Sequence, residues 1–331
     1  MTYGAKINLS TAAVSASGAT LAQTVSDRHG MTAQRSVRGR GLKIAVIIAS
    51  AGRPAEAARW VQYCTEQTLP PSELIYSIAR PGDLPEGFAD SSCRVIVGRG
   101  GLTIQRNAGM AAVTTDPDII AFFDDDYVPS LYCFEGIAKA FSEQPDLVAV
   151  SGILLADGIH SAGIPYADAQ QMVEEFDRTH SWQPMTVTPL AGTYGCNMAF
   201  RTSAIAGEQF DERLPLYGWQ EDVDFSQRVA RRGMMATSNL FYGVHQGSKG
   251  GRTSGKKLGY SQIVNIVYLM RKGTMPTGKG VTNMVRNMIA NHVKALKPEP
   301  WVDRKGRAIG NWMAIFDVLL RRDKPEKIMD M

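Results

Sequence analysis

The feature that most constrains this chain is a run of three aspartates, Asp124-Asp125-Asp126, directly after an unbroken apolar stretch over residues 119–123. The apolar stretch is short and β-prone, which predicts a strand buried on both faces. Three carboxylates at the carboxyl end of such a strand repel one another, and a hard divalent cation relieves that repulsion. Ligands of open α/β sheets bind beyond this end of the strands. The run therefore indicates a site for Mg²⁺ or Mn²⁺, with a solvated acidic turn as the alternative.

The charge of the 331 residues is unevenly spread along the chain. Residues 1–40 carry 5 Lys/Arg and 1 acidic residue, residues 41–250 carry 15 and 25, and residues 251–331 carry 16 and 6. The net charges of these segments are thus +4, −10 and +10. An acidic body with a basic tail predicts an anionic partner for the tail: a membrane surface, nucleic acid or phosphates.

The spacing of the cysteines favours a protein of the reducing cytoplasm, and hydropathy indicates no membrane-spanning segment. The four cysteines, at positions 64, 93, 133 and 196, form no C-x-x-C pair, so neither a zinc site nor a disulfide framework is indicated. No stretch reaches the roughly 18–20 apolar residues that cross a bilayer. Residues 1–40 lack the apolar segment of a secretory signal and are rich in small polar residues, which predicts a disordered leader.

Strands and helices alternate over the first 150 residues. Five apolar runs predict strands, at 43–48, 74–78, 94–97, 119–123 and 147–154. Helices are predicted after Pro54, after Thr103 as an N-cap, and from Ser130. This alternation predicts a mostly parallel sheet with helices on both faces. The glycine-rich patterns of nicotinamide and P-loop enzymes are absent, which disfavours both classes.

The second half of the chain is less regular. Gly192 and Gly195 lie at the start of the segment 192–201, where the backbone must turn sharply or approach a ligand. Glu221 and Asp222 open a predicted helix whose first turn favours negative charge. His245 follows a predicted strand and precedes a glycine-rich basic loop over 247–252.

In this order, these segments resemble an inverting family 2 glycosyltransferase of the bacterial exopolysaccharide type, roughly over residues 43–250. The resemblance rests on Ser50 and Arg53 in the first turn, Arg106-Asn107, the aspartate run, the 195–198 segment, Glu221-Asp222, Arg228 and Gly233. It implies the α/β GT-A fold, with a mixed, mostly parallel sheet and helices on both faces. It also implies a catalytic domain over 41–250, followed by a basic loop and an amphipathic helical tail over 251–331.

The resemblance further implies roles for particular residues. A cation held by Asp124 and Asp126 would offset the charge of a leaving diphosphate, and His245 as a further ligand would suit Mn²⁺ better than Mg²⁺. Asp222 is implied as the base, with Glu221 orienting it or an acceptor hydroxyl. The implied donor-binding residues are Ser50, Arg53, Arg106, Asp124, Asp125, Lys249 and Arg252.

A structural alternative stands beside several of these roles. Glu221 and Asp222 would also complement the dipole of a helix start. His245 would serve as a structural histidine, and the loop with Lys249 and Arg252 as a solvated loop. Trp219 is an acceptor-stacking candidate or, alternatively, a core residue.

One segment departs from the family pattern. Members usually carry a double aspartate and a serine after the second strand, where an aspartate holds the nucleobase. Here the place reads Ser77-Ile78-Ala79-Arg80-Pro81-Gly82-Asp83. The nucleobase contact, and with it the nucleotide, is left open by the motif.

Two segments of the tail have apolar residues on one helical face, with cations around them. They are Val281, Met284, Val285, Met288 and Ile289, and then Trp312, Ile315, Phe316, Leu319 and Leu320. Such helices lie in a membrane interface, where each cation contributes on the order of 1 kcal/mol at an anionic surface. Packing on the body, or a homodimer contact, is the alternative.

The sequence therefore predicts a metal-dependent hexosyltransferase that uses a nucleoside diphosphate sugar, a uridine one, in exopolysaccharide or cell-surface glycan synthesis. Its acceptor would be lipid-linked or a polysaccharide, on the inner face of the cytoplasmic membrane, and no nucleic acid partner is expected. One alternative is a sugar-phosphate nucleotidyltransferase, whose glycine-rich basic signature the 49–54 turn matches poorly. The other is a non-catalytic nucleotide-sugar-binding relative.

Overall fold

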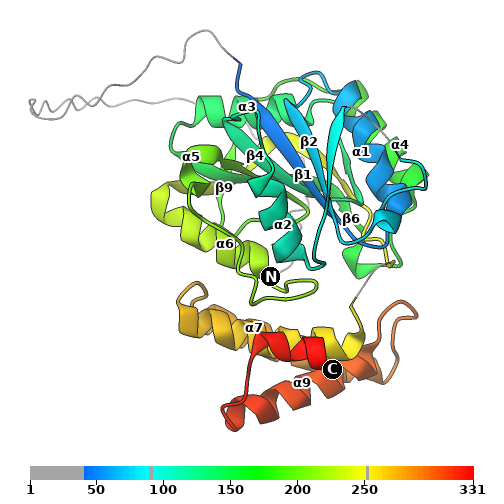
Figure 1. Ribbon diagram of the computed structural model, residues 1–331, viewed down its shortest axis with the longest axis vertical. Helices are drawn as coiled ribbons and strands as arrows, with labels where there is room; N and C mark the ends of the chain where they lie inside the picture. The colour runs from blue at the N-terminus through cyan, green and yellow to red at the C-terminus, as the bar shows by residue number, and fades with distance from the viewer. Residues whose placement is uncertain (1–40, 89–91, 251–252) are drawn as a thin grey trace, which may run out of the picture. The chain divides into compact units, whose positions relative to one another are not determined.

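The computed structural model describes residues 41–88, 92–250 and 253–331. Residues 42–331 form one compact unit built around a mixed nine-stranded sheet (Figure 1). The leader predicted over 1–40 lies outside the described residues. None of the helices in the described parts of the chain has the length and apolarity of a membrane-spanning segment.

The sheet has the order β3-β2-β1-β4-β8-β6-β9-β5, with β7 on β9. The strands are β1 (Ile44–Ser50), β2 (Glu73–Ile78), β3 (Cys93–Val97), β4 (Ile119–Asp124), β5 (Tyr127–Pro129), β6 (Leu147–Asp157), β7 (Val187–Pro189), β8 (Asn197–Arg201) and β9 (Met234–His245). The first four strands in the sheet order are parallel, as predicted. Beyond β4 the sheet is mixed, because β8 runs antiparallel to both of its neighbours while β6 and β9 are parallel.

Helices cover both faces of the sheet, as the alternating pattern predicted (Figure 1). One core contains Val46 and Ile48 of β1 together with residues of α1 (Pro54–Glu66), α3 (Cys133–Glu143) and α4 (Tyr166–Arg178). The other contains Ile47 together with residues of α2 (Leu102–Ala111), α5 (Thr202–Ile205) and α6 (Glu221–Val229). Successive side chains of a strand point to opposite faces, which is why these strands are apolar without interruption.

The start of α2 differs from the prediction. Gly101, with φ of 127°, is the N-cap, and the helix begins at Leu102. Thr103 therefore lies inside the first turn, where its hydroxyl donates to the carbonyl of Leu214 at 3.2 Å. The threonine is used for a long-range contact, so the prediction of Thr103 as the cap was wrong.

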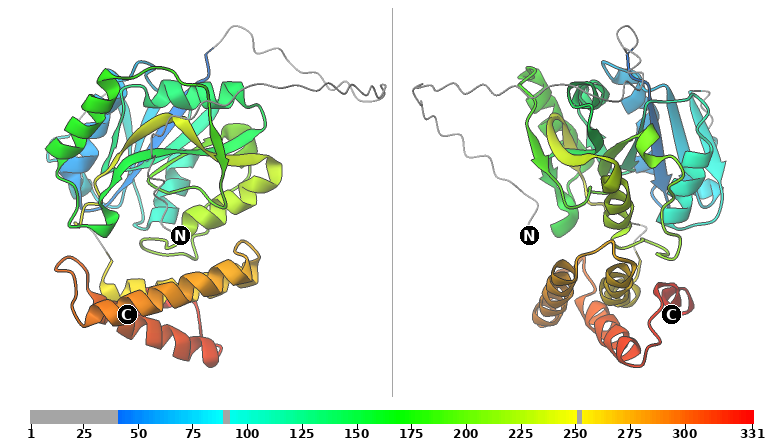
Figure 2. Two further views of the ribbon diagram at one scale, coloured as in Figure 1. Left: turned by 180° about the vertical axis from the view of Figure 1, so that it is seen from behind. Right: turned by 90° about the vertical axis from the view of Figure 1, so that its left-hand side faces the viewer.

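The tail folds into three long helices and a final 3₁₀ turn, η4 (Pro325–Asp330), packed as a bundle (Figure 2). The helices are α7 (Gly255–Lys272), α8 (Thr277–Ala295) and α9 (Arg304–Leu319). The sequence indicated α8 and α9 but missed α7. Ile266 and Leu269 of α7 pack against Leu214 and Val223, while Tyr260 packs in a second cluster with residues of α9. Polar residues of α7 such as Gln262 and Asn265 are buried beside its apolar ones, so the polar positions of this segment do not mark the exposed side of a helix.

Glycines allow α7 and α9 to approach closely. A Cβ on Gly259 would lie 2.1 Å from the carbonyl oxygen of Arg307, and one on Gly310 would lie 2.1 Å from that of Lys256. Backbone cannot shift as a flexible side chain can, so this crossing requires the absence of a side chain at both positions.

We predict that Gly259→Ala destabilises the protein by about 1–3 kcal/mol, the usual cost of overpacking. Helix propensity alone would favour the alanine, so the sign separates the two effects. The matched control is Gly278→Ala in α8, where no atom lies within 4 Å of the added Cβ. Denaturant unfolding measures both, and an unchanged or raised stability of Gly259→Ala would contradict the prediction.

Candidate active site

The register of the sheet brings the aspartate run beside His245. Asp124 ends β4, and Asp126 directly precedes Tyr127, which pairs with His245 across β5 and β9. The Nε2 atom of His245 lies 3.5 Å from Oδ1 of Asp126 and 3.9 Å from Oδ2 of Asp124. One ligand atom from each of the three residues lies within 4.8 Å of the others.

Asp157 orients the histidine. It ends β6, which runs parallel to β9, and lies opposite His245 in the register. Its Oδ1 is 2.8 Å from Nδ1 of His245, and its Oδ2 accepts a hydrogen bond of 3.0 Å from the Tyr194 hydroxyl. A carboxylate on the second ring nitrogen is the usual support of a metal-binding histidine, because it turns the first nitrogen toward the ion. The sequence analysis missed Asp157, although an aspartate at the end of an apolar run was the available signal.

The cluster is electrostatically suited to a cation. Burial alone would lower the pKa of His245, but Asp126 and Asp157 outweigh it and raise the pKa to about 10. Burial would raise the pKa of Asp126, but His245 and Arg53 outweigh it and lower the pKa. Oδ1 of Asp126 is buried and has no well-formed hydrogen bond from any described residue. The carboxylates of Asp124 and Asp126 and the imidazole of His245 are a ligand set that fits Mn²⁺ or Mg²⁺, and the imidazole favours Mn²⁺.

Arg53 compensates the rest of the negative charge. Its guanidinium lies 2.8 Å from Oδ1 of Asp125 and 2.9 Å from Oδ2 of Asp126. Ser50, at the end of β1, donates a 2.6 Å hydrogen bond to the other oxygen of Asp125. The indole of Trp60 on α1 donates to the Asp125 carbonyl at 3.2 Å. Both carboxylate oxygens of Asp125 and its carbonyl are thus bonded to protein groups. The contacts of Ser50, Arg53 and Asp125 with the donor stay predictions.

A buried guanidinium joins the aspartate run to the start of α6. Arg106, on α2, forms an ion pair with Glu221 and lies 3.3 Å from Oδ1 of Asp124. It also donates a 2.8 Å hydrogen bond to the carbonyl of Gly195. The metal-side and helix-side carboxylates therefore share one buried cation and belong to one site. Arg106 is held by protein groups on both sides, so its contact with the donor stays a prediction.

Asp222 is positioned by backbone groups. Its Oδ2 accepts a 3.0 Å hydrogen bond from the Gly195 amide, and its Oδ1 accepts one of 2.8 Å from Val223. Burial raises the pKa of Asp222, and it also raises that of Glu221 against the opposing effect of Arg106. The preceding residue, Gln220, has a positive φ of 72°, a conformation that costs a non-glycine residue on the order of 1–3 kcal/mol. These carboxylates can hold a proton more readily than exposed ones.

Three other predicted residues have distinct environments. Trp219 lies two residues before Glu221, the first residue of α6. Its carbonyl accepts a 3.0 Å hydrogen bond from Asn265 of α7. The ammonium of Lys249 donates to the carbonyls of Gly158 and Ile159 at 3.0 and 3.2 Å. Arg252 lies outside the described residues. The acceptor role of Trp219 and the donor roles of Lys249 and Arg252 stay predictions.

The segment that departs from the family pattern has a structural use for its carboxylate. Asp83 accepts hydrogen bonds from the amides of Gly52, Ala79 and Arg80, at 2.8 to 3.0 Å. It therefore ties the turn after β1 to the turn after β2. Gln105 makes a similar link, because its amide donates to the carbonyls of Ser50 and Ser77. Both residues support the site edge, and the sequence analysis assigned neither.

The sheet thus carries a cluster of possible metal ligands at its carboxyl edge, and Arg106 joins a second pair of carboxylates to it. Residues 82–206 match the family model described as glycosyl transferase family 2. The matched segment is less than half of the chain, and the chain as a whole shares the GT-A fold of solved glycosyltransferases. No curated protein matches it in sequence.

Solved structures share the fold at low sequence identity. A mannosyltransferase of Pyrobaculum calidifontis, PcManGT, in complex with GDP-Man and Mn²⁺, is 13% identical, with a TM-score of 0.50; the match covers 88% of this chain and 86% of that one. GalNAc-T7 with UDP, GalNAc and Mn²⁺ is 12% identical, with a TM-score of 0.52. That match covers 87% of this chain and 56% of GalNAc-T7, so this chain corresponds to about half of that protein.

We predict that Asp126→Asn weakens Mn²⁺ binding by more than the roughly 10–100-fold that loss of an outer-shell partner costs, because it neutralises the only ligand oxygen that is buried without a well-formed hydrogen bond. Isothermal titration with MnCl₂ measures the affinity. Asp168→Asn, an exposed aspartate on α4, is the control and should bind as the unaltered protein does. Equal affinity of Asp126→Asn and the control, with both folded, would remove the metal role.

We also predict that Arg106→Gln costs about 3–5 kcal/mol of stability, because it leaves the buried Glu221 without its counter-charge. The double variant Arg106→Gln/Glu221→Gln should lose less than the sum of the single changes, since it removes both charges. Urea unfolding of the four proteins completes the cycle. Strict additivity would show that the pair does not act as a unit.

Proposed function

We propose that this chain is a metal-dependent, inverting glycosyltransferase whose base is Asp222. The observation that carries the proposal is Arg106, which lies within 3.3 Å of Asp124 on one side and pairs with Glu221 on the other. Asp124, Asp126 and His245 would hold the cation, which when bound offsets the negative charge of the leaving diphosphate. The bound Mn²⁺ of PcManGT and GalNAc-T7 supports the choice of this metal.

The residues around Asp222 would prepare the acceptor. Its carboxylate accepts the proton of the acceptor hydroxyl while that oxygen attacks the anomeric carbon of the donor. The amides of Gly195 and Val223 hold the carboxylate in place, which avoids reorientation during the reaction. Glu221, fixed by Arg106, orients the acceptor hydroxyl. Trp219, two residues before the helix, offers a ring for stacking a sugar.

The donor would be a nucleoside diphosphate hexose, and we propose a uridine one. Both structural neighbours above have nucleotide groups bound, UDP in one and GDP-Man in the other, which supports the donor class. The acceptor would be lipid-linked or a polysaccharide, as in exopolysaccharide or cell-surface glycan synthesis at the inner face of the cytoplasmic membrane. Screening nucleotide sugars for a rise in melting temperature with Mn²⁺ identifies the donor, because a ligand of the folded state stabilises it.

We predict that Asp222→Asn retains donor binding and loses transfer by a factor on the order of 100–10,000, the usual contribution of a general base. In the unaltered enzyme, transfer should fall as the pH drops through the raised pKa of Asp222, because the protonated carboxyl cannot accept a proton. Nucleoside diphosphate release is the readout, with calorimetry of donor binding beside it. Asp168→Asn serves again as the matched control. Transfer by Asp222→Asn at the control's rate would assign the base elsewhere.

A further inference from the structure

The helices α8 and α9 expose two apolar stripes. On α8 and its C-cap, five residues are 45–90% exposed: Val281, Val285, Ile289, Val293 and Leu296. On α9 and its C-cap, five residues are 45–75% exposed: Ile309, Trp312, Phe316, Leu319 and Leu320. Spacings of three and four residues place each set on one side of its helix. These side chains face away from the interior of the bundle, which other side chains such as Tyr260, Val264 and Ala314 form.

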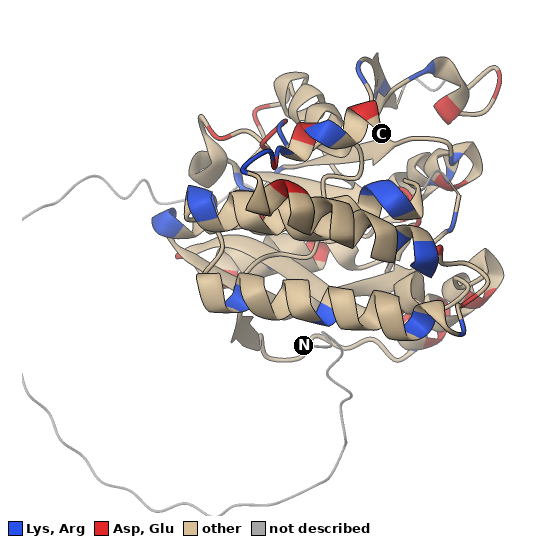
Figure 3. Ribbon diagram, turned by 90° about the horizontal axis from the view of Figure 1, so that it is seen from below, with Lys and Arg blue, Asp and Glu red and all other residues tan. Residues whose placement is uncertain are grey.

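The two stripes form one patch, which we name the outer face and define by these ten residues. Figure 3 shows α8 and α9 side by side on the side turned to the viewer, and Figure 2 shows the same neighbourhood from another direction. The rings of His292 on α8 and Trp312 on α9 are in edge contact, with centroids 5.8 Å apart. Scattered single apolar residues are normal on a surface, whereas a contiguous patch of large ones marks an interaction site.

Cations lie on and next to the two helices that carry the outer face. Six exposed cations on or next to α8 and α9 form no ion pair with an acidic residue of the described segments: Arg286, Lys297, Lys305, Arg321, Arg322 and Lys324. Two of the acidic groups nearby are engaged, since Asp317 bonds to Tyr260 and Lys327 and Asp323 pairs with Arg271. In Figure 3 basic residues accordingly predominate along both helices.

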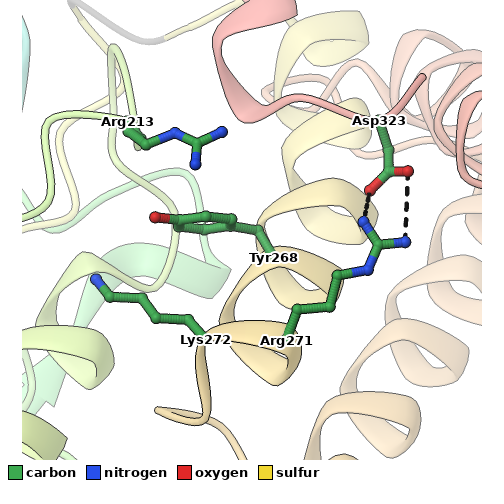
Figure 4. A pocket seen from close by; sticks show the side chains of 5 residues that line it. All are labelled: Arg213, Tyr268, Arg271, Lys272 and Asp323. Carbon is green, nitrogen blue, oxygen red and sulfur yellow. Dashed lines mark hydrogen bonds and ion pairs between the residues drawn. The ribbon is translucent and has the colours of Figure 1, made fainter. Parts of the chain in front are cut away.

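A nearby hollow does not account for these charges. It has a volume of about 400 Å³ and is lined by Arg213, Tyr268, Arg271, Lys272 and Asp323 (Figure 4). Its cations are already compensated, because Arg271 pairs with Asp323, Arg213 lies 2.6 Å from Glu326, and Lys272 lies 2.6 Å from Asp211. A second hollow, of about 760 Å³, is lined by three of the six cations, Arg321, Arg322 and Lys324, together with Glu326 and Asp330. The other three, Arg286, Lys297 and Lys305, line neither hollow and lie on or next to α8 and α9.

We propose that the outer face docks on an anionic lipid surface, with its apolar side chains in the interfacial layer and its cations at the phosphates. A second copy of this chain is a poorer occupant, because a symmetric contact would set these cations against one another.

The outer face is preformed, since a buried amide network fixes the three helices. Asn291 donates to Gln262 at 2.8 Å and to Asn311 at 2.9 Å.

This inference rests on the proposed function in one respect: docking on a membrane would bring a lipid-linked acceptor to the site. The bundle is joined to the base-bearing helix, because Lys272 lies 2.8 Å from Asp224 and Thr274 donates to the same carboxylate at 2.7 Å. Vesicle binding needs no nucleotide sugar, so it is measured independently of transfer. A failure of one proposal is therefore distinguishable from a failure of the other.

The experiment sediments the full chain with phosphatidylcholine vesicles that contain phosphatidylglycerol, and with phosphatidylcholine alone. We expect binding to the anionic vesicles, weakened about fivefold for each cation removed in Arg286→Gln/Lys297→Gln. Trp312→Gln/Phe316→Gln should weaken it at least about tenfold. The matched control Met172→Gln/Phe176→Gln removes similarly exposed apolar groups from α4, 41% and 48% exposed, and should bind as the unaltered protein.

Melting temperatures close to that of the unaltered protein establish that the variants are folded. The proposal is overturned if the unaltered protein does not bind anionic vesicles, or if Trp312→Gln/Phe316→Gln binds them equally well. A concentration-dependent dimer that these two substitutions dissociate also overturns it, because a second copy would then cover the outer face.

Discussion

The ion pair of Arg106 with Glu221 is the interaction on which the site depends. The two residues are 115 positions apart in the chain, and both are buried. A buried carboxylate without a counter-charge is strongly destabilising, so α6 can present Glu221 to the sheet edge only where a cation meets it. The same guanidinium reaches Asp124, and so the first turn of α6 and the carboxyl end of β4 face one space.

The remaining negative charge is divided between protein and ligand. Arg53 and Ser50 satisfy Asp125, and Arg53 also pairs with one oxygen of Asp126. The other Asp126 oxygen, Asp124 and His245 are left directed toward one another. Asp157 holds the histidine for this purpose. The site therefore combines a rigid frame with an acidic cluster that the protein does not fully compensate, which is the electrostatic condition for binding a cation.

The C-terminal bundle has two unlike surfaces. Its inner helix, α7, is bound to the part of the chain that contains the sheet, through Leu214 and Val223 and through the buried Asp224. Its outer helices carry apolar side chains toward solvent, although their own interior is closed by an amide network. Large apolar groups that are exposed together in this way mark an interaction surface.

The sequence by itself determined the features that depend on neighbouring residues. The apolar runs specified β1 and β4, and Glu221-Asp222 marked the first turn of α6. The aspartate run also indicated a possible cation site at the edge of the sheet where the parallel strands have their carboxyl ends. Only the tertiary structure decided which distant residues meet there, because strand order is not written in local periodicity. It placed Asp157 beside His245 through the β6–β9 register, and Arg106 between two carboxylates from different elements. It also revealed α7, in which polar residues such as Gln262 and Asn265 are buried beside apolar ones, so that the polar positions do not mark an exposed side.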